Sequence, residues 1–151
     1  MRQIASPLLA LILLAVVNLA WLSMALGADG RTATNVLKEF TDYNLTICGT
    51  GARRAINTWR AGGQVDEQYE FGECIVEARI EGKKLYATAL TEISEKNATK
   101  EALKDYFATW LTALANVKPH SYETLQSYND RQSDYAAKAE LLWNKFELES
   151  E

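Results

Sequence analysis

Residues 125–146, LQSYNDRQSDYAAKAELLWNKF, carry the pattern that decides the fold class. Seven positions recur there in alternating steps of three and four residues: Leu125, Tyr128, Gln132, Tyr135, Ala139, Leu142 and Phe146. This spacing places all of them on one face of an α-helix, and its regularity is typical of a seam that packs against other helices. We therefore expect a helix from about Tyr122 to Glu149, capped by Ser121 and packed within its own chain.

Helical periodicity also runs through the chain upstream of this segment. Apolar residues repeat at three and four over the stretches 33–47, 52–59, 66–93 and 97–117. No strand pattern occurs, and the connections between the stretches are short. The sequence therefore predicts an all-α fold, a small antiparallel bundle of about four main helices.

Glycine, threonine and aspartate residues mark the expected helix ends. We expect Thr32 or Thr34 to cap the first helix, and Asp66 to open the third. Residues 48–51 (CGTG) are expected to interrupt the first helix, and the glycine pair at 62–63 to stop the piece that follows. Gly82 lies on an apolar stripe, where a residue without a side chain indicates close approach by a neighbouring helix.

The first 27 residues predict export. Arg2 is their only charge, an unbroken apolar run extends from Leu8 to Val17, and small residues follow at Ser23, Ala25 and Gly27. These features are typical of a cleaved signal peptide. The uncharged stretch is also long enough for an uncleaved transmembrane anchor, which needs about 20 residues. Either alternative leaves residues 28–151 as a single helical domain outside the cytoplasm, periplasmic or secreted, or held on a single-pass anchor.

Cys48 and Cys74 are the only cysteines. Two cysteines on one small exported domain are most simply explained by one disulfide. No C-x-x-C motif is present, and His120 is the only histidine that could complete a zinc site. We therefore expect a structural disulfide between the two, with no metal and no cofactor.

Charge and missing motifs limit the possible functions. Without Arg2 the domain carries 20 acidic side chains and a net charge near −5, and no basic run exceeds two residues. This disfavours binding to nucleic acid, and any membrane association would come from residues 1–27. Nucleophile-elbow, phosphate-loop and dinucleotide motifs are absent, and His120 is expected to be a solvated loop residue. An enzyme based on carboxylate pairs remains as a further alternative.

Two clusters are candidates for binding. The first, which we call the acidic ridge, repeats carboxylates at three and four along one flank of the third helix: Asp66, Glu70, Glu73, Glu77 and Glu81. It is either a solvated face or a docking face for a basic partner. The second is an aromatic set that either packs as ordinary core or lines a ligand pocket: Trp110, Tyr128, Gln132 and Tyr135. Tyrosine hydroxyls are the expected hydrogen-bond partners of Gln132.

The sequence as a whole favours an exported, non-enzymatic module that docks a protein partner as a monomer. The alternative is a bundle that holds a small apolar or aromatic ligand. Asn44 and Asn97 match the acceptor motif for N-glycosylation, which matters only in a eukaryotic secretory pathway.

Overall fold

The computed structural model describes residues 31–93, 97–120 and 123–151, and the expected signal or anchor segment lies outside these ranges. Over the described residues the chain is all-helical, with four long helices, a short π-helical segment and no strand. In chain order the elements are α2 (Ala33–Arg60), η1 (Gln68–Gly72), α3 (Glu73–Glu92), α4 (Asn97–Ala115) and α5 (Leu125–Ser150). None of these helices is long and apolar enough to cross a membrane.

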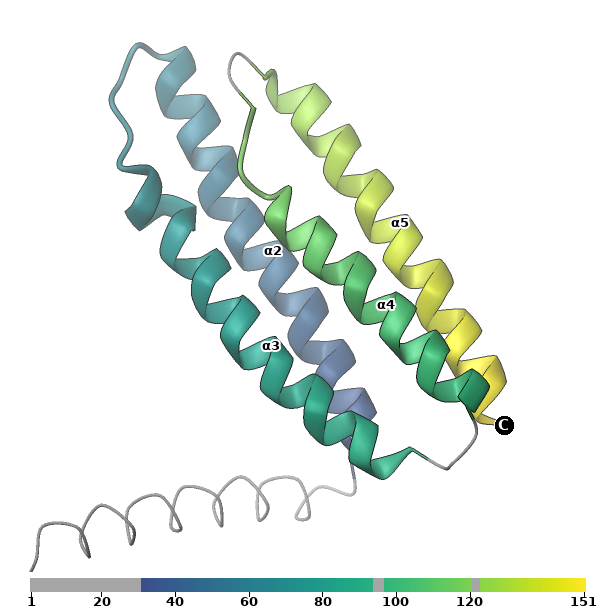
Figure 1. The fold of residues 1–151 in the computed structure, drawn as a ribbon. Coiled ribbons are helices and arrows are strands. Elements are labelled where there is room, and N and C mark those ends of the chain that lie inside the picture. The colour runs from purple at the N-terminus through teal and green to yellow at the C-terminus, as the bar shows by residue number, and fades with distance from the viewer. Residues whose placement is uncertain (1–30, 94–96, 121–122) are drawn as a thin grey trace, which may run out of the picture.

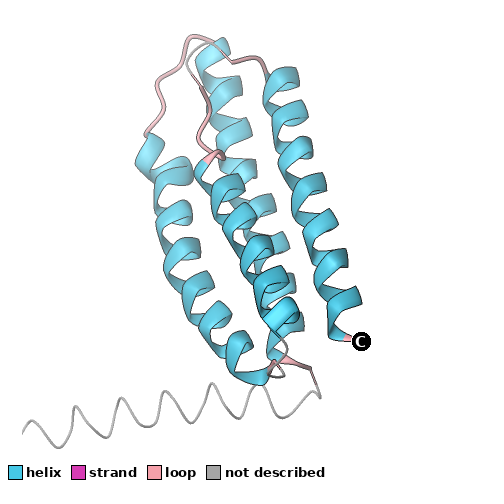
Figure 2. Cartoon of the chain, turned by 45° about the vertical axis from the view of Figure 1, so that its right-hand side comes forward, coloured by secondary structure: helices cyan, strands magenta, loops and turns pink. Residues whose placement is uncertain are grey.

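The four helices form an up-and-down bundle made of two hairpins (Figures 1 and 2). The most extensive packing is within each hairpin, between α2 and α3 and between α4 and α5. The α2–α3 and α4–α5 connections lie at the same end of the bundle, which we call the distal end. The start of α2 and the end of α5 lie at the opposite end (Figure 1).

Both ends of α2 are capped. Thr32 accepts a hydrogen bond from the Asn35 amide at 3.2 Å, and the Glu92 carboxylate accepts one from the Ala33 amide at 2.6 Å. At the other end Gly62 adopts a left-handed φ of 77°, which glycine tolerates without a side-chain clash. Of the two expected caps, Thr32 and Thr34, the structure has Thr32, and the glycine stop is confirmed.

The expected interruption of this helix at residues 48–51 is wrong, because α2 continues through them without a break. A Cβ at Gly51 would lie 1.8 Å from the Glu70 carbonyl oxygen, so this glycine permits close contact between α2 and η1. Gly82 of α3 likewise permits a close contact, because a Cβ at this position would lie 2.6 Å from the Trp110 ring. The close approach predicted at Gly82 is therefore confirmed.

Cys48 and Cys74 form a disulfide that joins the middle of α2 to the first turn of α3, with a Cα–Cα distance of 5.6 Å. The bond closes a loop of 26 residues in sequence separation. On the chain-entropy model a loop of this length stabilises the fold by about 3.5 kcal/mol. A disulfide of this kind indicates an oxidising, extracytoplasmic environment.

Aromatic side chains fill the interface between the two hairpins. Trp110 of α4 is fully buried and donates its indole N–H to the Thr41 carbonyl of α2 at 3.0 Å. Tyr106, one turn before it, bonds the Thr41 hydroxyl at 2.5 Å. Burial raises the pKa of Tyr106 well above its usual range. These contacts fix α4 against α2 without a covalent bond.

α5 differs from its expected form in two details. Its N-cap is Thr124, which accepts a hydrogen bond from the Ser127 amide at 3.1 Å, so the cap predicted at Ser121 is wrong. Trp143 is buried beside the expected seam, whereas Leu142 is only half-buried. A straight α-helix turns slightly less per residue than a strict seven-residue repeat requires, so the buried face drifts from Leu142 to Trp143.

Candidate functional site

The acidic ridge runs along η1 and α3, and the structure divides it into engaged and open carboxylates. Asp66 accepts a hydrogen bond from the Tyr69 amide at 3.3 Å, Glu70 pairs with an arginine of α2 at 3.1 Å, and Glu81 pairs with a lysine one turn on at 2.8 Å. Glu73 and Glu77 are exposed, and no such contact is found for them among the described residues. These two carboxylates are the part of the ridge that is available to a partner.

Apolar side chains lie next to these two carboxylates on the same outward side of α3. Tyr69 is 76% exposed, Val76 is 51% exposed and Ile80 is 54% exposed. Val76 and Ile80 are four residues apart, which places them on one face of α3, and Tyr69 lies in η1 just before that helix. We call this surface the outer α3 face, defined by Tyr69, Glu73, Val76, Glu77 and Ile80.

The second candidate is a cavity at the distal end, between the two hairpin connections. It has a volume of about 660 Å³. Its apolar part comes from Ile56, Trp59 and Pro119. Its polar part comes from the last residue of α2 and from both connections: Arg60, Glu67, Lys118, His120, Glu123 and Thr124. Volumes of this size are typical of small-molecule sites.

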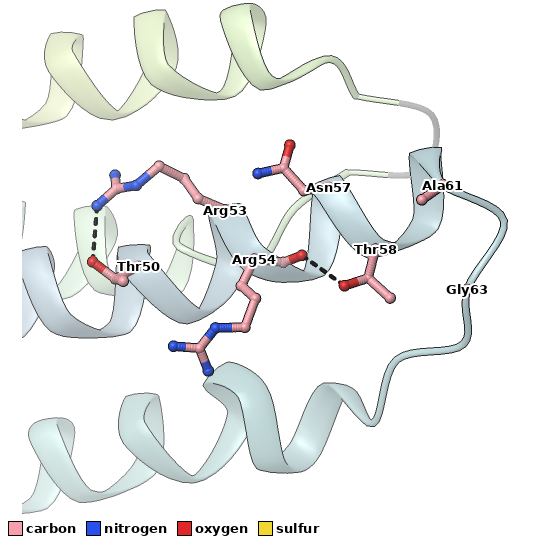
Figure 3. A pocket seen from close by; sticks show the side chains of 7 residues that line it. All are labelled: Thr50, Arg53, Arg54, Asn57, Thr58, Ala61 and Gly63. Atoms are coloured by element: carbon pink, nitrogen blue, oxygen red, sulfur yellow. Dashed lines mark hydrogen bonds between the residues drawn. The ribbon is translucent and has the colours of Figure 1, made fainter.

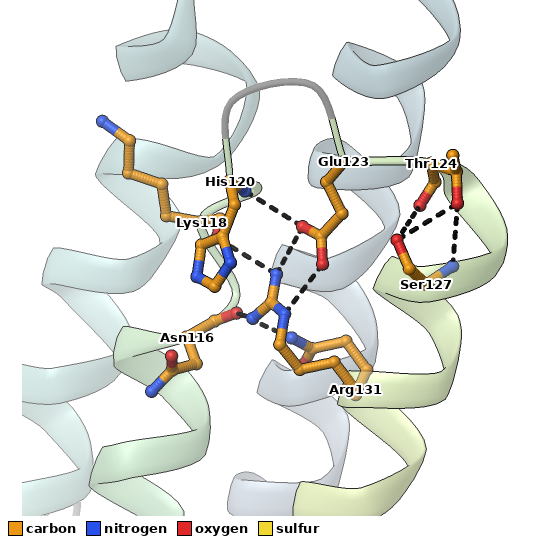
Figure 4. A network of polar contacts seen from close by, with 8 residues as sticks. Asn116, Lys118, His120, Glu123, Thr124, Ser127 and Arg131 are labelled. Carbon is orange, nitrogen blue, oxygen red and sulfur yellow. Dashed lines mark hydrogen bonds and ion pairs between the residues drawn. The ribbon is translucent and has the colours of Figure 1, made fainter.

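A half-buried ion pair holds one wall of the cavity in place (Figure 4). Arg131 of α5 donates from Nε and Nη2 to both oxygens of Glu123, at 2.9 and 2.6 Å, and also reaches the Asn116 carbonyl. The His120 amide donates to the same Glu123 carboxylate at 2.9 Å. Hydrogen bonds from Arg131 hold the pKa of Glu123 below its usual range. We call this group the arginine clamp, and it ties the α4–α5 connection to α5.

Only some of the charged side chains that line the cavity form ion pairs. Lys118 pairs with Glu67 at 2.8 Å, which joins the two hairpin connections, and Glu123 is held by the arginine clamp. Arg60 stands in the last turn of α2, and no described residue forms an ion pair with it. Within the described part of the wall, the charged group that remains available is therefore a guanidinium.

A third hollow, of about 590 Å³, lies along the last turns of α2 (Figure 3). Four of its polar side chains already form hydrogen bonds or an ion pair. Arg53 donates to the Thr50 hydroxyl at 3.0 Å, Arg54 pairs with Glu70 at 3.1 Å, and the Thr58 hydroxyl donates to the Arg54 carbonyl at 3.0 Å. Figure 3 shows Arg53 and Arg54 extending in different directions from the helix. This arrangement braces α2 and does not converge on a ligand.

The aromatic set predicted as a ligand pocket is dispersed along the bundle. Trp110 is fully buried beside Gly82, and Tyr135 is half-buried under Lys138. Gln132 donates to the Asn116 carbonyl at 2.7 Å, so the tyrosine partner expected for it is wrong. Tyr128 is fully buried, and no described residue bonds its hydroxyl. The hollows at the distal end, along α2 and at the start of α2 are lined by other residues.

Three further candidates are the hollow at the start of α2, the two N-glycosylation motifs and a metal site. The hollow where α2 begins is the smallest of the three, at about 210 Å³. Asn44 is half-buried and donates its amide to the Phe40 carbonyl at 2.8 Å, whereas Asn97 is exposed at the start of α4. Over the described ranges no group of three or more histidine, cysteine or acidic side chains could hold a metal ion.

The sequence contains a signal for the distal cavity that helical periodicity alone does not reveal. Trp59 precedes one helix end and Pro119 follows another, and an antiparallel bundle brings those two connections to the same end.

Comparison with protein-family models, with curated proteins and with solved structures finds no match. Functional assignment therefore depends on the surfaces of this chain.

Proposed function

We propose that the chain is an exported, non-enzymatic helical module that binds a protein partner through the outer α3 face. The observation that carries this proposal is the exposed pair Val76 and Ile80, one helical turn apart and each more than half exposed, bordered by Glu73 and Glu77. An apolar centre with a charged rim is the usual composition of a protein-binding surface.

The charge of the rim defines the partner. Glu73 and Glu77 would attract a surface that carries lysine or arginine around an apolar centre, and long-range attraction of this kind mainly raises the association rate. The disulfide braces α2 against α3, so the face is held in one shape before binding. A preorganised face loses less conformational entropy on association.

The test begins with a photo-crosslinking residue at position 76 in the native host, with the same residue at Leu141 as control. Leu141 is exposed on α5 and belongs to a different face. We expect one partner to be crosslinked at position 76 and not at position 141. Crosslinking of the same protein at both positions would contradict the proposed site.

Affinity for that partner is then measured with two variants. Replacing Val76 and Ile80 by serine should weaken binding at least tenfold, since two apolar anchors are worth about 1.5 kcal/mol or more. Glu73→Gln with Glu77→Gln should slow association and flatten its salt dependence. Leu141→Ser is the matched surface control and should change neither quantity. Unchanged binding by both variants would refute the proposal.

A further inference from the structure

We propose that the distal cavity is a binding site for a small aromatic carboxylate, and that Arg60 is the group that holds the carboxylate. This inference goes beyond the proposed protein docking, because the site lies between the two hairpin connections and not on the outer α3 face. The juxtaposition that carries it is an exposed indole beside a guanidinium that no described residue pairs, in a cavity of about 660 Å³.

The apolar part of the cavity suits a flat ring. Ile56 of α2 is fully buried, Pro119 of the α4–α5 connection is buried, and both line the cavity. Trp59 also lines the cavity, with 37% of its surface exposed. An exposed indole in a hollow offers a stacking surface, and aromatic pairs contribute beyond their buried area. A ring system of one or two six-membered rings fits this space.

The charges select the sign of the ligand. The acidic groups of the wall already have partners, because Glu67 pairs with Lys118 and Glu123 is held by the arginine clamp. Arg60 complements the negative end of the α2 dipole, but no described residue uses its hydrogen-bond donors in an ion pair. A planar guanidinium binds a carboxylate through two parallel hydrogen bonds. A carboxylate is therefore favoured over an ammonium group.

The cavity is built before any ligand arrives. The arginine clamp fixes the α4–α5 connection on α5, and an exposed ion pair between Lys118 and Glu67 links that connection to the α2–α3 connection. Gly62 and the backbone hydrogen bonds of its neighbours hold the end of α2. A preformed wall reduces the ordering cost of binding a small molecule.

The experiment uses nitrogen-15-labelled protein expressed from the full-length sequence and two probes with the same ring and opposite charge, 1-naphthylacetate and 1-naphthylmethylamine. The readout is the indole N–H signal of Trp59, assigned by its loss in Trp59→Leu. We expect 1-naphthylacetate to shift this signal in a saturable manner, and 1-naphthylmethylamine to bind at least tenfold more weakly. The Trp110 signal should move little, because that ring is buried elsewhere in the bundle.

Variants separate the two parts of the site. Arg60→Gln should weaken 1-naphthylacetate about tenfold or more, the effect of losing one charge-assisted hydrogen bond. Arg79→Gln removes an exposed arginine of α3 outside the cavity and should leave affinity unchanged. Thermal melting of each variant confirms that the fold is retained.

Three results would overturn the proposal: no saturable shift of the Trp59 signal at millimolar probe, equal affinity for the two probes, or unchanged affinity in Arg60→Gln. None of them bears on docking at the outer α3 face, because Val76 and Ile80 lie outside the cavity. Failure of this inference is therefore distinguishable from failure of the proposed function.

Discussion

Replacing Gly51 by alanine should destabilise the domain, although alanine is the better helix former. A Cβ at this position would lie 1.8 Å from the Glu70 carbonyl oxygen and 2.9 Å from its carbon. Real side-chain carbons do not approach closer than 3.0 Å, so α2 and η1 must separate by about 1.2 Å. The obstructing atoms belong to the backbone and cannot rotate away.

The expected magnitude follows from two opposing effects. Overpacking of a close contact costs about 1–3 kcal/mol, and a backbone obstacle places Gly51→Ala at the upper end of that range. The gain in helix propensity from glycine to alanine is about 1 kcal/mol. The net loss in the free energy of unfolding is therefore about 2 kcal/mol, which corresponds to roughly 8 °C in Tm for a domain of this size.

Gly49→Ala is the matched control, two residues earlier on the same helix. Its Cβ would lie 3.4 Å from the Tyr128 hydroxyl, an ordinary contact, so the propensity gain remains and stability should be unchanged or higher by up to about 1 kcal/mol. Urea unfolding under non-reducing conditions measures both variants. If Gly51→Ala proves as stable as Gly49→Ala, the close contact between α2 and η1 is refuted.

The remaining predictions concern stability. Cys48→Ala should lower the free energy of unfolding by about 2–5 kcal/mol, and Cys74 of the unaltered protein should resist alkylation until reductant is added. Tyr106→Phe should cost about 1 kcal/mol, because its hydroxyl is bonded, whereas Tyr128→Phe should be neutral or stabilising. Burial raises the pKa of Tyr128 to about 12, whereas its pKa in the unfolded chain is about 10. The stability that depends on its neutral hydroxyl is therefore fully present below the unfolded pKa and is lost as the pH rises through about 12. Tyr128→Phe should reduce this alkaline unfolding. The pKa of Glu123 is lowered by its arginine partner, so its contribution is present above about pH 4.5 and is lost as the pH falls; Glu123→Gln should flatten that acid limb in urea unfolding.

Sequence periodicity was sufficient to locate the four long helices, because the buried face of a helix is visible in the spacing of apolar residues along the sequence. It predicted four long helices, a threonine cap at residue 32 or 34, the glycine stop and the close approach at Gly82. It failed at residues 48–51, where a local rule about glycine was overridden by tertiary contact. Gly51 does not end α2, because its missing side chain serves η1, a segment 17 to 21 residues further along the chain.

The candidate sites were less predictable because they depend on contacts between segments that are distant in the sequence. Glu73 and Glu77 were identified by spacing, but only three-dimensional partners show that Glu70 and Glu81 are engaged. The distal cavity depends on which side chains of two separate connections face one another. Spacing along one helix carries no information about that relation.

The length of α2 has a consequence for where binding takes place. Its 28 residues, at about 1.5 Å each, separate residue 33 from the distal cavity by about 40 Å. If the preceding segment is retained as an anchor and the bundle stands upright on it, the cavity lies several Debye lengths from the bilayer, since that length is about 8 Å at physiological salt. The surface potential of anionic lipids decays within this distance. Capture of a negatively charged ligand would then be insensitive to the lipid composition of the membrane.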